Sequence, residues 1–382
     1  MATVVAGTAP PRRRPASART ARWAMVLTTA LLAAGFARRD EPAPPDAPSP
    51  DAFDPSHKNE PAARAARERG RGRHSSTPSE LPARGWKDIV IRVYRNIGED
   101  RVMLVAAGVT FYALLAIFPA IAALVALYGL FADPSSIAGQ VDMLSGVLPG
   151  GALDVVRDQL SRVAAQGPSK LGAAFVIGLA VSLWSANAGI KSIFDALNLV
   201  YNEKEKRGLI GLNLVSLAFT IAAIVFVLVA IACIAALPAV FSSGQLSGTA
   251  ALIAQIARWP ILLVIIAFGL AVVFRYGPSR SEPQWRWISW GSAFAAIAWI
   301  VVSIAFSWYA QNFGSYNKTY GSLGAIIVFM FWIWLSVAVV LIGAELDAQM
   351  EHQTARDTTT AGGKPIGARG AQMADTVGAR QD

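Results

Sequence analysis

The best candidates for chemistry in this chain lie in residues 182–198, which read SLWSANAGIKSIFDALN. Asn187 and Lys191 are four residues apart, as are Lys191 and Asp195, so one helix would carry all three side chains on one stripe. Lys191 and Asp195 could form a local ion pair worth roughly a few tenths of a kcal/mol. Alternatively the stripe lines an inner vestibule, because ionisable residues near a membrane core often mark a permeation pathway. We favour the ion pair.

A carboxylate in residues 343–351, GAELDAQME, is the second candidate. Glu345 follows an apolar run of more than twenty residues, which places it at or just inside a membrane interface. A carboxylate buried at that depth needs a basic partner. Lys191 and Arg101 are the basic residues expected at a similar depth. The sequence therefore predicts an ion pair between Glu345 and one of these two residues.

The third candidate is the polar stretch 312–325, NFGSYNKTYGSLGA, which separates two apolar runs. Asparagine, glycine and serine are turn formers, and tyrosines suit a membrane interface. The stretch is either a helix-hairpin turn on the outer side or the outer wall of a pathway, and we favour the turn. Its candidate residues are Asn312, Ser315, Tyr316, Asn317 and Tyr320.

Sets of residues that would support catalysis are missing from the sequence. There is no GxSxG, P-loop or HExxH motif and no cluster of His and Asp. The three histidines, His57, His74 and His352, all lie in terminal segments, and the single cysteine, Cys233, lies in an apolar run. We therefore expect no enzymatic activity, no cofactor and no metal site.

The composition indicates a membrane protein. The chain of 382 residues is 54% hydrophobic and 15% charged, whereas a soluble domain carries about 25% charged residues. No charged residue occurs between Gly208 and Ala257. We expect an all-α fold in which residues 102–347 form a polytopic membrane helical bundle with six transmembrane helices. An amphipathic N-terminal helix at 81–101 and an outer helical loop at 132–170 complete it. The expected spans are Val102–Phe131, Leu171–Ile190, Leu209–Phe241, Ala250–Phe274, Ile288–Gln311 and Ser322–Ala344.

The segment 81–101 carries an apolar stripe formed by Trp86, Val90, Val93 and Ile97, and its charged residues fall on other faces. A basic amphipathic helix of this kind lies on an anionic membrane surface. Packing on the protein's own loops is the alternative, and the two interpretations are nearly equal.

The distribution of basic residues predicts the orientation. Sixteen Lys and Arg lie in 84–101, 191–208, 275–286 and 351–382, against five in the segments expected on the other side. The positive-inside rule then places both termini in the cytoplasm. The same rule accounts for the net charge of +9 without a nucleic-acid partner.

The two ends of the chain read as disordered cytoplasmic segments, 1–80 and 348–382. The first is rich in Ala, Pro and Arg and low in aliphatic residues, so it cannot bury a core. The apolar run Trp23–Ala37 interrupts it. That run is a signal-like segment, a weak extra anchor or an extension from a misplaced start codon, and we favour the extension.

Five motifs occur in order: AAGVTFYALLAIFPA, WSANAGIKSIFDALNLVY, RYGPSR, NFGSYNKTYGSLGA and GAELDAQ. With these motifs the chain, from about Trp86 to Glu351, resembles the YihY/virulence factor BrkB family of bacterial inner-membrane proteins. The resemblance implies six spans and cytoplasmic termini. It implies no established biochemical activity and no functional residues. Some members carry a ribonuclease label, for which this sequence holds no nuclease motif.

Three functions follow, in decreasing order of preference. The first is a transporter or permease-like protein with an unknown small-molecule or lipid substrate. The second is a non-catalytic envelope protein or scaffold that organises lipids or partner proteins. A membrane-associated ribonuclease comes last. Membrane lipids are the expected partners, and the sequence leaves the oligomeric state open.

Overall fold

The computed structural model describes residues 65, 67–128, 173–242, 249–313, 323–360 and 362–381. This part of the chain is helical and contains one isolated antiparallel bridge, between Pro283 and Thr359, but no longer strand. Its helices are η3 (Pro78–Glu80), α3 (Ala83–Glu99), α4 (Val102–Tyr128), α7 (Ala173–Val200), α8 (Leu209–Ser242), α9 (Thr249–Tyr276), α10 (Trp285–Phe313), α12 (Leu323–Glu351) and α13 (Gln372–Asp375). The expected all-α fold is confirmed.

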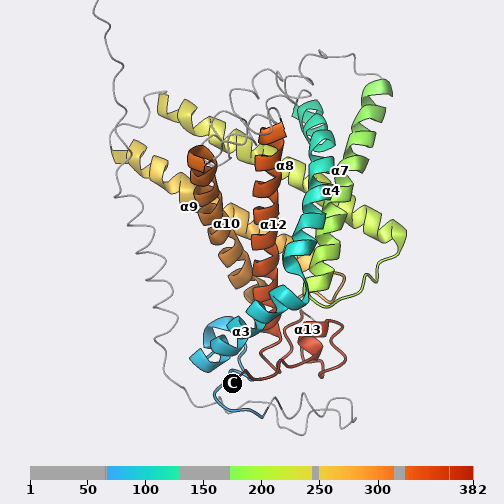
Figure 1. Cartoon of the computed structure of the whole chain (residues 1–382), viewed down its shortest axis with the longest axis vertical. Helices are drawn as coiled ribbons and strands as arrows, with labels where there is room; N and C mark the ends of the chain where they lie inside the picture. The colour runs from blue at the N-terminus through green and yellow to red at the C-terminus, as the bar shows by residue number, and fades with distance from the viewer. Residues whose placement is uncertain are drawn as a thin grey trace, which may run out of the picture. The chain divides into compact units, whose positions relative to one another are not determined.

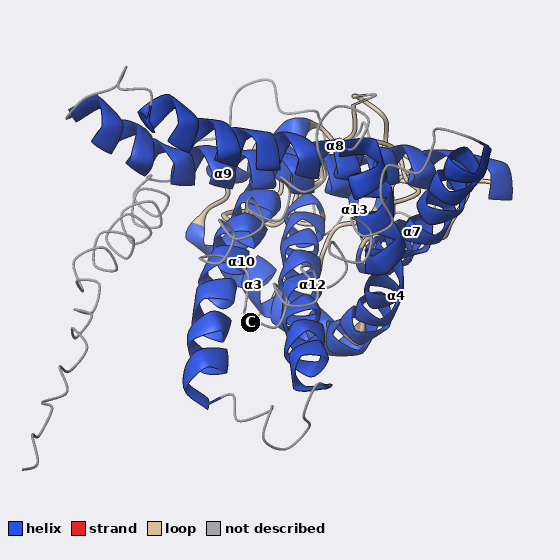
Figure 2. Cartoon of the chain, turned by 90° about the horizontal axis from the view of Figure 1, so that it is seen from above, coloured by secondary structure: helices blue, strands red, loops and turns tan. Residues whose placement is uncertain are grey.

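The long helices are arranged around α12 (Figure 1). Helix α12 lies between α10 and α4, and α7 lies beside α4. Helices α8 and α9 cross behind these four at an oblique angle, and the view from above places them along one side (Figures 1 and 2). Helices α4 and α12 are far apart in sequence but lie in contact, so α12 closes the bundle.

Small and aliphatic side chains form the core around α12. Ala338, Leu341 and Ala344 of α12 are buried in one cluster with Ala295 of α10 and Ala106 of α4. Helices without a hydrophobic driving force between them associate through close packing, which small residues permit. The core therefore lies where α12 meets its two neighbours.

Glycines make the crossing of α10 and α12 unusually close. A Cβ atom on Gly291 would lie 2.2 Å from the carbonyl oxygen of Gly343 and 2.4 Å from Cγ of Asp347. A Cβ atom on Gly343 would lie 2.6 Å from Cβ of Ala295. The two helix backbones thus touch at this point, and the contact places Asp347 against α10.

The structure supports only part of the expected count of six membrane spans. Among the described residues, four helices are long and apolar enough to cross a membrane, and up to five if α3 and α4 count as one broken span. Helices α3 and α4 meet at a 60° bend, where Arg101 adopts a left-handed backbone conformation (φ 50°). The six long helices α4, α7, α8, α9, α10 and α12 cover the expected positions, but the count of six spans is not confirmed.

Helix α3 packs on the protein through a face that the sequence analysis expected to be solvated. Asp88, Ile89 and Arg92 are buried, whereas Val90 and Tyr94 are exposed. Asp88 accepts hydrogen bonds from Arg71 at 2.6 Å and from the amide of Gln381 at 3.0 Å. Three residues of the apolar stripe, Trp86, Val93 and Ile97, are partly buried against the core clusters. Helix α3 therefore packs on the protein through polar as well as apolar residues, as the alternative interpretation of this segment supposed.

The chain after α12 differs from the expectation of a disordered tail at 348–382. Thr354, Thr358 and Met373 are buried, and the amide of Ala355 donates to the carbonyl of Arg73 at 2.8 Å. Residues 67–80, within the N-terminal segment expected to be disordered, supply the other half of these contacts. The physical reason is that the polar residues of the two segments satisfy each other's hydrogen bonds, which composition alone does not reveal.

The basic segments expected on one side of the membrane meet at one end of the bundle, at the bottom of Figure 1. The amide of Thr360 donates to the carbonyl of Glu282, and the amide of Gln372 donates to Glu203. We call this end, formed by α3, residues 67–82, 201–208, 277–284 and 352–381, the basic end. Trp23–Ala37 and the predicted helical loop 132–170 lie outside the described residues.

Candidate functional site

Asn187 lies in the buried centre of α7 and faces α8. Its side chain is 1% exposed, and its Oδ1 accepts a hydrogen bond from Oγ1 of Thr220 at 3.3 Å. Ser216, one turn earlier in α8, is also buried. The predicted polar stripe therefore starts at a real contact between two helices.

Lys191 continues that contact towards the basic end. Its Nζ donates to Oδ1 of Asn213 in α8 and lies 5.5 Å from the ring centre of Trp184. Asp195 is exposed, and the described part of the chain shows no ion pair between it and Lys191. The structure thus brings Asn187 and Lys191 together with α8, while Asp195 points elsewhere, so the expected local ion pair does not form.

Three carboxylates are fully buried where α12 reaches the basic end: Glu345, Asp347 and Glu351. Oδ1 of Asp347 accepts the backbone amide of Gly291 at 2.7 Å across the glycine crossing. Oε1 of Glu345 accepts Nε2 of Gln349 at 3.0 Å. The second oxygen of each of these two groups, Oε2 of Glu345 and Oδ2 of Asp347, has no hydrogen-bond partner. Both residues lie in the candidate span Ile326–Glu351.

The predicted partner of Glu345 is wrong. Lys191 faces α8, and Arg101 is exposed at the bend between α3 and α4. The basic group near Glu345 is Arg92 of α3, and Gln349 lies between them. Nε of Arg92 donates to Oε1 of Gln349 at 2.7 Å, and the same Gln349 donates to Glu345. Arg92 also donates to Oε1 of Gln353 at 2.6 Å. The hypothesis failed because depth along the membrane normal does not determine which face of α12 a residue meets.

Glu351, by contrast, has a direct ionic partner. Both guanidinium nitrogens of Arg280 donate to its carboxylate, at 3.0 and 2.8 Å, and both side chains are fully buried. The guanidinium lies 4.0 Å from the ring centre of Tyr201. Burial opposes the charged form, but the carboxylate of Glu351 raises the pKa of Arg280 above its ordinary value. Burial also raises the pKa of the Tyr201 phenol well above its ordinary value, so it remains neutral.

The family model for virulence factor BrkB matches residues 93–365, which is well over half of the chain. The chain belongs to the virulence factor BrkB family. The match contains Asn187, Lys191 and all three buried carboxylates of α12. It extends past the end of α12 as far as residue 365.

Three relatives are similar over 67–70% of this chain. The putative ribonuclease-like protein YfkH of Bacillus subtilis is 30% identical over 279 residues, which cover 70% of this chain and 95% of that protein. The UPF0761 membrane protein RSc1559 of Ralstonia nicotianae is 26% identical and covered over 57% of its length. PSHAa0171 of Pseudoalteromonas translucida, also a UPF0761 membrane protein, is 24% identical and covered over 85%. No solved structure matches the chain.

Most of the remaining predicted candidates of this BrkB family member lie outside the described residues. Ser315, Tyr316, Asn317 and Tyr320 fall between α10 and α12, outside the described residues, and Asn312 is described only as part of α10. The sequence analysis missed Asp347, Gln349 and Arg280, although GAELDAQ and RYGPSR contain them. Within the described residues, no three His, Cys, Asp or Glu side chains are grouped as metal ligands.

His352 gives the basic end a predicted dependence on pH. Burial, together with the charges of Arg92 and Arg73, lowers the pKa of His352 to about 3. Its Nδ1 is enclosed without a hydrogen-bond partner. The pKa of His352 in the folded state lies below its value of about 6.5 in the unfolded state. Its contribution to the free energy of unfolding is therefore complete above about pH 6.5 and is lost as the pH falls towards 3. Between pH 8 and 5 the free energy of unfolding should fall by on the order of 1–2 kcal/mol more in the wild type than in His352→Gln.

The measurement is chemical unfolding in detergent at pH 8, 6.5 and 5, followed by tryptophan fluorescence. Other groups titrate equally in both proteins, so the difference between the two curves isolates His352. Identical losses in the two proteins would show that His352 has the same pKa in the folded and the unfolded protein.

Proposed function

We propose that this BrkB family member is a transporter-like protein that moves a polar solute or a lipid across the inner membrane, with Glu345 and Asp347 binding a coupling proton or cation. The observation that carries the proposal is the pair of fully buried carboxylates, each with one oxygen free of hydrogen bonds, in a candidate span. Ionisable residues at such depth are costly and mark ion or substrate pathways. Packing alone is a weak reason to keep them, because apolar side chains would pack without that cost.

The chemistry of the two groups supports ion binding. A carboxylate oxygen without a donor is a free acceptor, which a proton or a small cation can occupy. Arg92 reaches Glu345 only through Gln349, so the carboxylate is oriented but not neutralised by direct contact. Asp347 is oriented in the same way by the amide of Gly291. Occupation of these oxygens would therefore change the local charge without first breaking an ion pair.

The orientation expected from the sequence fits the proposal. The basic end gathers α3 and segments that together hold most of the Lys and Arg among the described residues, and the positive-inside rule assigns such an end to the cytoplasm. The carboxylates would then lie near the cytoplasmic mouth of the pathway. The Asn187–Thr220 contact would lie farther into the bundle, in the predicted span.

The test is flux in proteoliposomes containing the full chain. The solute panel is taken from the metabolite and lipid changes in a deletion strain. At least one solute should show saturable, protein-dependent uptake. Glu345→Gln and Asp347→Asn should lower that uptake by about tenfold or more, because each variant removes a charge that the coupling ion must meet. Glu99→Gln removes an exposed carboxylate on α3 and should leave the uptake unchanged.

Other outcomes would overturn the proposal. The two carboxylates would have no part in transport if uptake were unchanged in all three variants, Glu345→Gln, Asp347→Asn and Glu99→Gln. No uptake across the panel, with reproducible crosslinked partners, would instead favour an envelope scaffold. RNA cleavage that persists through stringent purification in detergent would instead favour a ribonuclease, the activity after which the Bacillus relative is named.

A further inference from the structure

A cavity of about 500 Å³ lies at the basic end, between the start of α10 and the segment after α12. Most of its ionisable lining is basic: His74, Arg286, Arg356, Lys364 and Arg369, against one carboxylate, Asp357. The carboxylates of the transport proposal do not line it. The cavity is large enough for a phosphate group with part of an attached ester.

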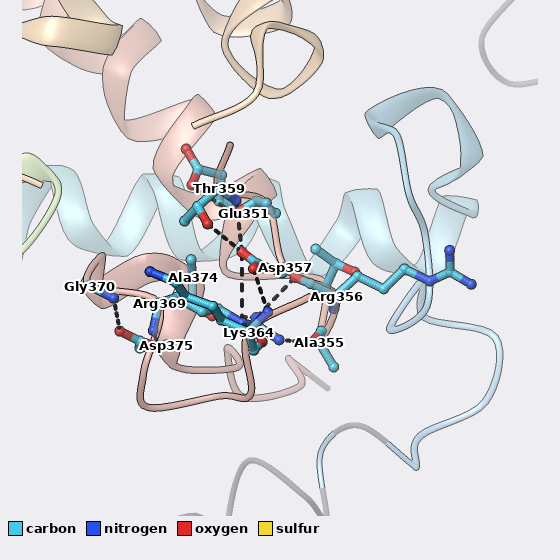
Figure 3. Close-up of polar contacts among 12 residues, drawn as sticks. Glu351, Ala355, Arg356, Asp357, Thr359, Lys364, Arg369, Gly370, Ala374 and Asp375 are labelled. Carbon is cyan, nitrogen blue, oxygen red and sulfur yellow. Dashed lines mark hydrogen bonds and ion pairs between the residues drawn. The ribbon is translucent and has the colours of Figure 1, made fainter. Parts of the chain in front are cut away.

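The single carboxylate, Asp357, cannot neutralise four Arg and Lys side chains, and its oxygens are hydrogen-bonded within its own loop. Oδ1 of Asp357 accepts the amide and hydroxyl of Thr359 at 2.9 and 2.7 Å, and Oδ2 accepts the amide of Lys364 at 3.0 Å. Its nearest cation is Arg369, at 3.9 Å. Figure 3 shows this cluster as a closed network of contacts within the segment after α12. Asp357 therefore shapes the loop and leaves the other cations unbalanced.

Arg369 is likewise committed to structure. Its guanidinium donates to the carbonyl oxygens of Ala355 at 2.7 Å, Arg356 at 3.0 Å, Lys364 at 3.1 Å and Ala374 at 2.6 Å. These bonds hold together the two sides of the loop that carry Arg356 and Lys364. Arg369 thus positions the cavity wall, and the charges available to a ligand must come from other residues.

Arg356 and Lys364 supply those charges. The side chain of Arg356 extends away from the network in Figure 3 and makes no hydrogen bond or ion pair in the described part of the chain. Its Nε is enclosed without a partner. Nζ of Lys364 likewise makes no hydrogen bond or ion pair with the described residues, and the guanidinium of Arg286 donates only to the side chain of Gln284. A buried guanidinium nitrogen without an acceptor is costly, and an anion would remove that cost.

The backbone leaves room for such an anion beside Lys364. Gly362 and Gly363 both have positive φ values, 58° and 73°, which side chains disfavour. A Cβ atom at either position would meet no atom within 4 Å, so this wall of the cavity is open. The glycine pair therefore lets a ligand approach the main chain next to the lysine.

The position of the cavity points to the source of the anion. Arg286 and Trp287 belong to the first turn of α10, where the candidate span Trp285–Ala310 begins. The phosphates of membrane lipids lie at this depth, and basic pockets at span ends bind lipid headgroups. We propose that the cavity is a binding site for a phosphate ester, with Arg356 and Lys364 as its charged ligands. The ester is the headgroup of an anionic phospholipid or a soluble phosphate ester with the same chemistry.

The test is a titration of the full chain in a nonionic detergent, followed by calorimetry. Three probes are used separately: dihexanoyl phosphatidylglycerol, glycerol 3-phosphate and inorganic phosphate. At least one ester probe should bind saturably, one molecule to each chain, and more weakly as the salt concentration rises. Arg356→Gln/Lys364→Gln should weaken that binding by about tenfold or more.

A matched variant distinguishes binding at this cavity from a nonspecific effect of removing two positive charges. Arg84→Gln/Lys204→Gln removes the same two charges from exposed positions at the basic end, away from the cavity lining, and should change the affinity by less than about twofold. Tighter binding of the lipid than of glycerol 3-phosphate assigns the site to a headgroup, and the reverse assigns it to a soluble ester. Equal losses in the two double variants, or no saturable binding of any probe, would overturn the site.

Discussion

Replacing Arg280 with methionine should lower the free energy of unfolding by about 3–5 kcal/mol, because it leaves the fully buried carboxylate of Glu351 without its ionic partner. Only the hydroxyl of Thr358, which donates to Oε2 at 3.1 Å, would remain to stabilise the charge. The contact of Arg280 with the ring of Tyr201 would be lost as well. The measurement is unfolding of the purified chain in detergent, followed by tryptophan fluorescence.

Two further variants make this result specific. Arg280→Met/Glu351→Leu removes both charges and should lose less stability than Arg280→Met alone, since no unpaired charge stays buried. Arg84→Met, at an exposed position in the first turn of α3, should change the stability by less than about 0.5 kcal/mol. A double variant at least as unstable as the single one would mean that Arg280 stabilises the fold mainly through Tyr201 or through its own packing.

The second large effect is expected at the glycine crossing. Gly291→Ala should destabilise the protein by about 1–3 kcal/mol, because its new methyl group would lie 2.2 Å from the main chain of Gly343. Helices α10 and α12 would have to separate, and the hydrogen bond from the amide of Gly291 to Asp347 would lengthen. Gly291→Leu should prevent the two helices from packing at all. Thermal unfolding in detergent and the yield of folded protein both report this.

The control for the crossing uses the same substitution at a glycine with open surroundings. A Cβ atom on Gly108 of α4 meets nothing within 4 Å, so Gly108→Ala should be neutral or slightly stabilising, by up to about 1 kcal/mol. If Gly291→Ala melted at the same temperature as Gly108→Ala, the close approach of α10 and α12 would not exist in the membrane protein.

The crossing also links stability with the proposed function. Any shift of α12 along α10 moves Asp347, whose Oδ1 is held by Gly291. Variants at Gly291 that still fold should therefore impair the flux expected for the wild type, without altering either carboxylate.

Much of the fold follows from local properties of the sequence. Long uncharged apolar runs form helices because their backbone groups must be satisfied internally in an apolar medium, and the described helices lie where those runs are. The uneven distribution of Lys and Arg identifies segments that share one end, and Figure 1 shows these segments together. Family membership also follows from the motifs, since the family model matches residues 93–365.

The partners of individual polar residues did not follow from the sequence. Glu345 and Lys191 were expected to pair because they lie at a similar depth. In the structure Lys191 faces α8, whereas Glu345 lies near α3. Arg92 reaches Gln349 across 257 positions of sequence, and nothing in the local pattern of α3 marks it as buried. The rotation of each helix about its axis decides these contacts, and that rotation depends on all the neighbours at once.

What the sequence by itself determined is the class of protein: an all-α membrane protein of the BrkB family whose basic segments share one end. Only the tertiary structure decided that residues 67–80 pack against the described residues of 352–381, and that Glu345 and Asp347 are buried, each with one oxygen that lacks a hydrogen-bond partner. It also decided that Arg356 and Lys364 face one cavity. The physical reason is that hydropathy and charge act additively along a chain, whereas the burial of a polar group depends on which distant donors and acceptors reach it.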